Sequence, residues 1–203
     1  RIAARDLTAA EPLTLLPDIA AELADLAGAV LEGALALARA ATADQDCCRL
    51  AVVALGKTGA HELNYLSDVD VLFVAEPAIG AGQEPRCGPD QAVAIGTRLA
   101  ATLSRICSEH SAAGTIWAVD SGLRPEGKAG PLVRTLASME AYYTRWATSW
   151  EFQAMLKARP AAGDLTLGQA FCDLVSPLVW AAGEREGFIH DTQAMRQRVI
   201  SLI

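Results

Sequence analysis

The chain has 203 residues, enough for one ordinary domain and part of a second, and 52% of them are apolar, so a sizeable core can be buried. Its formal net charge is −7 and its pI is near 5.0. This acidity argues against nonspecific binding to nucleic acid or to a membrane surface, because phosphate groups demand a basic face. A small nucleotide, or a nucleotide carried on a protein, fits the composition better.

The first predicted element is a long helix that opens at Pro17-Asp18 and carries one continuous apolar stripe. Its most apolar part, residues 26–38, contains Glu32 and is too short to span a bilayer. Pro160 and Gly163 are interpreted as breaks, and a helical pattern follows from Leu165 to the end. Between these, strands are predicted at about 50–55, 69–74 and 115–120, helices at 91–108, 139–147 and 150–158, and loops at 77–89 and 125–131.

Two aspartates lie in the second predicted strand, Asp68-Val-Asp-Val-Leu-Phe-Val74. Residues i and i+2 of a strand point to the same face, so Asp68 and Asp70 project together, while Val69, Val71 and Phe73 face a core. Adjacent carboxylates repel each other unless a cation lies between them. Oxygen ligands of this kind suit Mg²⁺, which usually takes one or two carboxylates and completes its shell with substrate phosphates.

A glycine-containing turn, Gly56-Lys-Thr-Gly59, follows the first predicted strand. Backbone N–H groups of such a turn can approach a phosphate. Asp120 ends the third predicted strand, as Asp68 and Asp70 mark the second. Together, the turn and the carboxylates predict metal-assisted chemistry on a nucleotide.

The five cysteines are odd in number and lack any C-x-x-C spacing, and no signal peptide is apparent. Reduced thiols in the cytoplasm are the simplest interpretation. The chain begins at Arg1 and stops at Ile203 without a closing signal, so we expect a piece of a longer protein.

The central part of the chain resembles the nucleotidyltransferase core of the family of bifunctional glutamine synthetase adenylyltransferase/adenylyl-removing enzymes. The fold that this resemblance implies is that of the DNA polymerase β superfamily. The similar motifs are Gly56-Lys-Thr-Gly-Ala60, Glu62-Leu-Asn64, Ser67-Asp-Val-Asp70, Asp120, Leu123-Arg-Pro125, Gly127, Gly130-Pro-Leu-Val133, Trp150-Glu151 and Lys157-Ala-Arg159. The expected fold is therefore α/β (α+β), a small mixed sheet with helices on one face. The expected segments are an N-terminal helical segment (1–46), the catalytic core (47–160) and the start of a helical domain (161–203).

Members of this family carry two catalytic halves, one that removes AMP from glutamine synthetase and one that adds it. Glu62-Leu-Asn64, Gly130-Pro-Leu-Val133 and Met155-Leu-Lys-Ala-Arg159 resemble the removing half, which is N-terminal in the family, and the alanine- and arginine-rich composition resembles actinobacterial members. The departures are Ala60 in place of a second glycine, His61 in place of a basic residue, and Ser121-Gly122 in place of a frequent arginine.

The resemblance implies phosphorolysis, in which inorganic phosphate attacks AMP on a tyrosine of glutamine synthetase to give ADP. The implied cofactor is Mg²⁺, with Mn²⁺ as the alternative, and a PII-type signalling protein is an implied partner of the whole enzyme. The implied catalytic residues and metal ligands are Asp68, Asp70 and Asp120. The implied nucleotide and phosphate ligands are Gly56, Lys57, Gly59, Ser67, Arg124, Lys128, Lys157 and Arg159.

Other interpretations stay open at this point. The chain could be the adding half, which uses ATP, or a noncatalytic nucleotide-sensing module. A transferase acting on a small molecule shares the core motif but lacks the Leu123–Val133 segment. Among single residues, Ser67 could cap a turn, Arg124 could form a structural salt bridge, and Glu151 could pair with Arg159 or Lys157.

Overall fold

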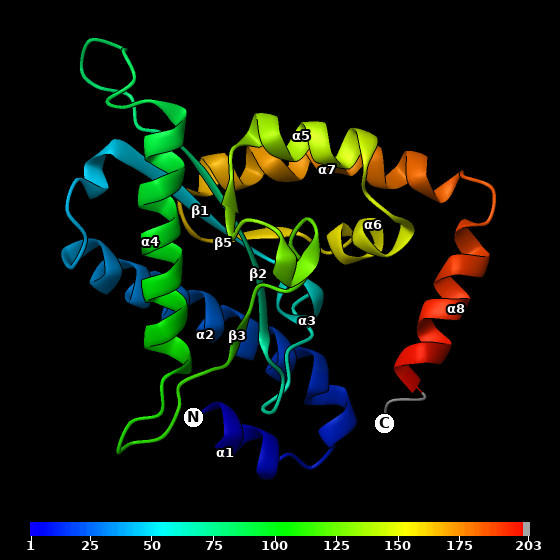
Figure 1. The fold of residues 1–203 in the computed structure, drawn as a ribbon. Coiled ribbons are helices and arrows are strands. Elements are labelled where there is room, and N and C mark those ends of the chain that lie inside the picture. Colours follow the sequence, from blue (N-terminus) through cyan, green and yellow to red (C-terminus); the bar gives the residue numbers. More distant parts are fainter. Residues whose placement is uncertain (201–203) are drawn as a thin grey trace.

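A computed structural model describes residues 1–200, and side chains through residue 197. The last three residues of the predicted segment 161–203 lie outside this range. The helices are α1 (Ile2–Leu7), α2 (Pro12–Ala40), α3 (Gly56–Gly59), α4 (Pro89–Ser108), α5 (Leu136–Arg145), α6 (Ser149–Met155), α7 (Leu165–Gly183) and α8 (Phe188–Ile200), with 3₁₀ turns at Gln45–Cys47 and Gly127–Ala129. The strands are β1 (Cys48–Ala54), β2 (Val69–Pro77), β3 (Val119–Asp120), β4 (Val133–Arg134) and β5 (Arg159–Gly163). The predicted α/β class with a small mixed sheet is confirmed (Figure 1).

The sheet is organised around β2. On one side, β2 pairs antiparallel with β1 over seven residues, from Ala54 opposite Val71 to Cys48 opposite Pro77. On the other side it pairs in parallel with two short strands, first β3 and then β4. β5 adds to the free side of β1 in an antiparallel direction. The start of β2, where the aspartates lie, therefore meets the end of β1 and the end of β3.

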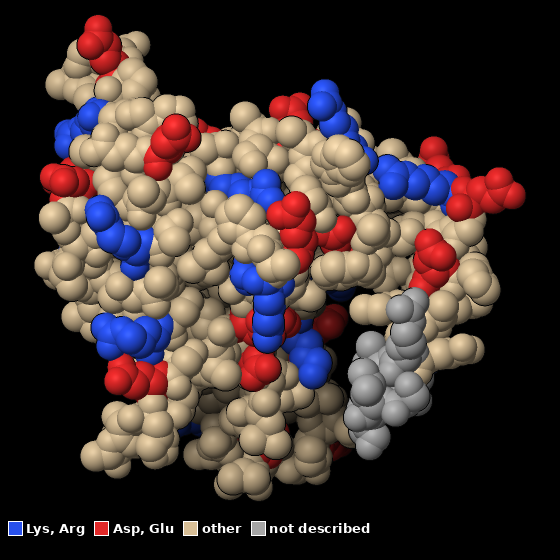
Figure 2. Space-filling model, in the orientation of Figure 1, with Lys and Arg blue, Asp and Glu red and all other residues tan. Residues whose placement is uncertain are grey.

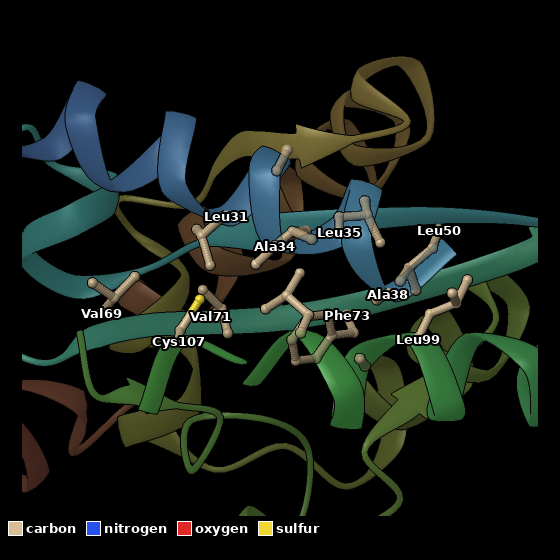
Figure 3. Close-up of a cluster of buried hydrophobic side chains, with 14 of the residues drawn as sticks. Leu31, Ala34, Leu35, Ala38, Leu50, Val69, Val71, Phe73, Leu99 and Cys107 are labelled. Atoms are coloured by element: carbon tan, nitrogen blue, oxygen red, sulfur yellow. The ribbon is translucent and has the colours of Figure 1, made fainter. Parts of the chain in front are cut away.

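Helices cover both faces of this sheet. On one face, α2 and α4 pack against Leu50 of β1 and Val69, Val71 and Phe73 of β2, as the close-up in Figure 3 shows. On the opposite face, α5, α6 and α7 pack against the alternate residues of the same strands, including Leu72 and Val74. The prediction of helices on one face only is wrong. The apolar residues at both alternating sets of positions make β1 and β2 central strands that are buried on both faces.

Several predicted boundaries differ from the structure. The long helix begins five residues before Pro17 and accommodates that proline within its second turn, and the short α1 before it was not predicted. The third predicted strand is reduced to Val119–Asp120. Arg159–Gly163 forms β5, although Pro160 and Gly163 were interpreted as breaks. Pro160 is tolerated because β5 is an edge strand with a register shift between Val52 and Val53 of β1.

The predicted boundary at residue 160 falls inside β5, so the sheet continues past it. α7 then packs on the sheet through Leu167, Phe171 and Val175. By length and composition alone α7 is the one helix among residues 1–200 apolar enough to cross a membrane. Its contacts with β1 and β2 account for this apolar character, since it lies along the sheet as a core helix (Figure 1).

Candidate active site

Parallel pairing of β2 with β3 places Asp70 directly opposite Asp120. Asp68 precedes β2 and is exposed, whereas Asp70 and Asp120 are half-buried. The predicted alternation is borne out on the apolar side, because Val69, Val71 and Phe73 all lie in the core. Figure 2 shows acidic and basic side chains gathered near the centre of one face, over the region of α3 and β3.

The surroundings of Asp70 disfavour the charged form of its carboxyl group. Burial raises its pKa above the ordinary value, and the negative charges of Asp120 and Asp68 raise it further, while Lys57 opposes the shift. An ionised carboxylate in this position lacks a compensating charge, which is the environment that a bound cation relieves.

The residues present fit a hard dication such as Mg²⁺. The available donors are carboxylate oxygens, and no group of three His, Cys, Asp or Glu side chains within residues 1–200 forms a ready-made metal cage. Mg²⁺ is characteristically held in this incomplete way, by one or two carboxylates with water and substrate phosphate oxygens as the other ligands. Asp70 and Asp120, with Asp68 at the rim, are thus the residues that would hold such an ion, and a metal site here stays a prediction.

The glycine turn α3 lies against Asp70. Gly56 has φ +51°, and a β-carbon there would come 2.5 Å from Oδ2 of Asp70, so this position needs glycine both for its backbone and for its space. Ala60 has an ordinary right-handed conformation, with φ −76° and ψ −7°. The left-handed residue is instead His61, with φ +58°. The alanine at position 60 thus imposes no backbone strain on the turn.

Gly59 fits into a space bounded by two backbone carbonyls. A β-carbon at Gly59 would lie 2.1 Å from the carbonyl oxygen of Lys157 and 2.8 Å from that of Ala54. Arg159 strengthens this contact, because its guanidinium donates to the carbonyls of Thr58 (3.2 Å) and Gly59 (3.4 Å). The Lys157 backbone and the Arg159 side chain, at the entry to β5, therefore hold the glycine turn in place.

Arg124 organises the loop that follows Asp120. Its guanidinium donates to the carbonyls of Ser121 (2.9 Å), Lys128 (2.9 Å) and Gly130 (3.1 Å). Asp120 Oδ1 accepts a hydrogen bond from the N–H of Gly122 at 2.7 Å, which fixes one of its oxygens. Among the described residues Arg124 does not form the salt bridge that was considered for it. The contact of Arg124 with phosphate stays a prediction.

A cavity of about 500 Å³ lies beside this turn, lined by Gly56, Lys57, Asn64, Leu66, Ser67, Asp68 and Asp70; we call it the acidic cavity. Lys57 Nζ donates to Ser67 Oγ (3.2 Å), and Ser67 Oγ donates to Asn64 Oδ1 (2.9 Å). The side chain that caps this turn is that of Asn64, whose Oδ1 accepts from the N–H of Leu66 (3.0 Å), so the capping role considered for Ser67 is not observed. The contact of Ser67 with phosphate stays a prediction. Lys157 is exposed and lies 3.7 Å from Glu62.

Two contributors to this region were missed from the sequence. Trp117 Nε1 donates to the carbonyl of Ser67 at 3.1 Å, which fixes the residue before Asp68. Glu151, buried at 2% exposure, accepts from the hydroxyl of Tyr142 at 2.7 Å and caps α6 through Thr148. The pairing of Glu151 with Arg159 or Lys157, considered as an alternative to a helix-packing role, is not observed. The Thr148-x-x-Glu151 capping-box spacing was the signal that could have shown its true role.

The Tyr142–Glu151 pair also reaches the loop after Asp120. The Tyr142 hydroxyl accepts a hydrogen bond from the N–H of Glu126 at 3.1 Å, and the guanidinium of Arg134 donates to the Glu126 carboxylate at 2.7 Å. Glu126 has φ +63°, a conformation that costs free energy for a residue with a side chain. These contacts hold the strained residue, and with it the loop that begins at Asp120.

Comparison with known proteins identifies the family. The family model described as glutamate-ammonia ligase adenylyltransferase matches residues 1–173. The chain belongs to this family. It is 59% identical over 203 residues to a protein of Cutibacterium acnes, 57% identical over 203 residues to one of Streptomyces avermitilis, and 50% identical over 194 residues to one of Mycolicibacterium smegmatis. Each of these is named bifunctional glutamine synthetase adenylyltransferase/adenylyl-removing enzyme.

These matches cover all of this chain in the first two cases and 95% of it in the third. They cover 20%, 19% and 18% of the respective relatives. The chain therefore spans about a fifth of the length of the relatives it matches, and the family resemblance predicted from the motifs is confirmed. The two activities in the relatives' name belong to proteins about five times as long.

Proposed function

We propose that this chain carries the adenylyl-removing activity, in which inorganic phosphate displaces AMP from a tyrosine of glutamine synthetase. The oxygen of phosphate bonds to the α-phosphorus, and the bond from phosphorus to the tyrosine oxygen breaks. The products are ADP and the free tyrosine, whose oxygen receives the proton of the attacking phosphate. The observation that carries the proposal is the pairing of Asp70 with Asp120 beside the glycine turn.

Each residue of the site has a part in this reaction. Asp68, Asp70 and Asp120 would hold Mg²⁺, or Mn²⁺ as the alternative, which would supply neutralisation of the charge that gathers on the phosphates. The N–H groups of the turn ending at Gly59 would receive nucleotide phosphate oxygens. Gly122 orients Asp120 through a hydrogen bond, and Arg124 keeps the intervening loop closed.

The choice of the removing half rests on the motifs at Glu62-Leu-Asn64, Gly130-Pro-Leu-Val133 and Met155–Arg159. The glutamine synthetase partner follows from the relatives' name, and inorganic phosphate and ADP follow from the proposed reaction. A PII-type signalling protein would act through the whole enzyme. Five free cysteines, four of them with thiol pKa values raised chiefly by burial, fit a cytoplasmic protein with reduced thiols.

The deciding experiment measures ADP released from adenylylated glutamine synthetase in Mg²⁺, with and without inorganic phosphate. Release that depends on phosphate supports the removing reaction. Transfer of AMP from ATP to unmodified glutamine synthetase, without ADP release from the adenylylated form, would assign the adding reaction instead. If the folded chain does neither, binding of ADP with and without Mg²⁺ would test the noncatalytic nucleotide-sensing module.

A further inference from the structure

An apolar cavity adjoins the acidic cavity. It has a volume of about 600 Å³ and is lined mainly by Leu16, Pro17 and Ala20 of α2 and by residues 60–64. Asn64 lines both cavities, so the apolar one begins where the acidic one ends. The metal and the phosphates require no apolar surface of this size, so the cavity has to receive another part of the substrates, the adenine base or the polypeptide, and Leu66 bears on that choice.

Leu66 projects into solvent at the edge of this pair of cavities. Its side chain is 96% exposed, and it lies two residues before Asp68 in the lining of the acidic cavity. Such exposure gives up the roughly 1.5–3 kcal/mol that burial of a leucine side chain contributes. Leu66 therefore has no packing role within the described chain.

The loop that carries Leu66 is nevertheless held in one conformation. The N–H of Leu66 donates to Asn64 Oδ1 (3.0 Å), and the Tyr65 hydroxyl donates to Asp6 of α1 (3.1 Å). Trp117 fixes the carbonyl of the next residue, Ser67. A local contact with Asn64 and two distant parts of the fold, α1 and the segment before β3, thus present an apolar side chain to solvent beside the reacting groups, as a preorganised contact does.

We propose that Leu66 and the apolar cavity form a docking surface for the protein substrate, receiving apolar side chains that flank the adenylylated tyrosine. This inference rests on the proposed function and names the surface through which the substrate is recognised. The acidic cavity, bounded by the glycine turn and the carboxylates, is the place proposed for the nucleotide and phosphate. The solvent-facing Leu66 beside it suits contact with a polypeptide, and the apolar cavity on the other side of Asn64 would extend that contact. Apolar contacts at the centre of an interface also supply affinity without requiring opposite charges on the two partners.

The test compares Leu66→Ser and Leu16→Ser with Ile79→Ser as a matched control. Ile79 is 53% exposed, close to the 55% of Leu16, and it follows the opposite end of β2. Dissociation constants for adenylylated glutamine synthetase are measured in Mg²⁺ without inorganic phosphate, so that binding is scored independently of turnover. We expect each substitution at the docking surface to weaken binding about tenfold, and Ile79→Ser to leave it within twofold of the unsubstituted chain.

A second readout distinguishes polypeptide from nucleotide. Phosphate-dependent ADP release from adenylylated tyrosine amide, which lacks the flanking chain, should be unchanged in Leu16→Ser. If Leu16→Ser lowers ADP release equally with the amide and with the protein substrate, the apolar cavity would be assigned to adenine and the proposal would be overturned. Unchanged binding of glutamine synthetase by both variants, or no binding by the unsubstituted chain, would overturn it as well. If the variants lose binding of adenylylated glutamine synthetase but no ADP is ever released, the result would contradict the proposed function and still support the docking surface.

Discussion

The clearest test of how the glycine turn is supported is Gly59→Ala. Gly59 is buried and its φ is not positive, so an alanine there meets a problem of space rather than of backbone conformation. The added carbon would lie 2.1 Å from the carbonyl oxygen of Lys157 and 2.8 Å from that of Ala54. Both obstacles are backbone atoms, Ala54 in β1 and Lys157 in the turn before β5, so neither can rotate away as the end of a side chain could. The turn and the segment entering β5 must move apart.

The expected cost follows from this overlap. Overpacking by one methyl group in a rigid interior typically destabilises a protein by about 1–3 kcal/mol. For a chain of this length, that loss lowers Tm by roughly 2–4 °C for each kcal/mol. The separation also shifts the turn relative to Asp70, and a displacement of about 1 Å in a positioned catalytic group can reduce the rate by roughly a hundredfold. We therefore expect a lower Tm together with a severe loss of ADP release.

The same substitution elsewhere supplies the control. A β-carbon at Gly33, in the middle of α2, meets nothing within 4 Å. Gly33→Ala should raise the free energy of unfolding by about 0.5–1 kcal/mol, because alanine loses less conformational entropy in a helix. Thermal denaturation by circular dichroism and the ADP assay are run on both variants. A Gly59→Ala protein with the Tm and activity of the unsubstituted chain would refute the claim that Lys157 and Arg159 support the turn.

Two further predictions concern charge. Asp70→Asn should abolish ADP release without lowering Tm in metal-free buffer, since it removes a carboxylate whose pKa burial and Asp120 raise; Mg²⁺ should then raise the Tm of the unsubstituted chain only, and retained activity would remove the metal-site assignment. Asp164 caps α7 and accepts from Arg49 at 2.6 Å, which holds the pKa of its carboxyl below 3.8. Its contribution is therefore present above that ordinary value and is lost as pH falls through the lowered pKa. Asp164→Asn should cost about 0.5–1 kcal/mol at pH 7, and urea denaturation should show the difference vanishing at low pH; a constant difference would contradict the linkage.

Local sequence patterns predicted the positions of the three aspartates better than they predicted the helical layers that cover the sheet. Asp68, Asp70 and Asp120 stand in short local patterns that predict where strands begin and end, and the parallel pairing of β2 with β3 agrees with that expectation. The second helical layer was not predicted, because apolar residues at every position of a strand show burial without showing what covers each face. β5 was missed since its pairing with β1 joins residues more than a hundred positions apart, and Pro160 within it resembles a break.

The contacts of Trp117 and Tyr142 could not have been inferred either. Trp117 fixes the carbonyl of Ser67, fifty residues earlier in the chain, and its aromatic side chain gives no sign of that partner. Tyr142 accepts from the N–H of Glu126, and the strain at Glu126 is invisible in a sequence because glutamate is not a residue that favours positive φ. Such contacts depend on tertiary packing, which local patterns do not encode.

The five basic residues predicted to contact phosphate are two arginines and three lysines, and the hydrogen bonds of the arginines set them apart; Lys157 lies near Glu62, at 3.7 Å between Nζ and Oε1. The guanidinium groups of Arg124 and Arg159 donate to backbone carbonyls and stabilise the loops on either side of the site. A guanidinium that leaves those exposed or part-buried carbonyls for a substrate would give up hydrogen bonds that contribute about 0.5–1.5 kcal/mol each. The lysine side chains are not held by backbone carbonyls in this way. Lys57 lies within the acidic cavity and Lys128 passes beside Gly122, next to Asp120. Because an ammonium group can turn toward an arriving anion without dismantling the fold, we expect Lys57 and Lys128, rather than the two arginines, to contact the phosphates directly.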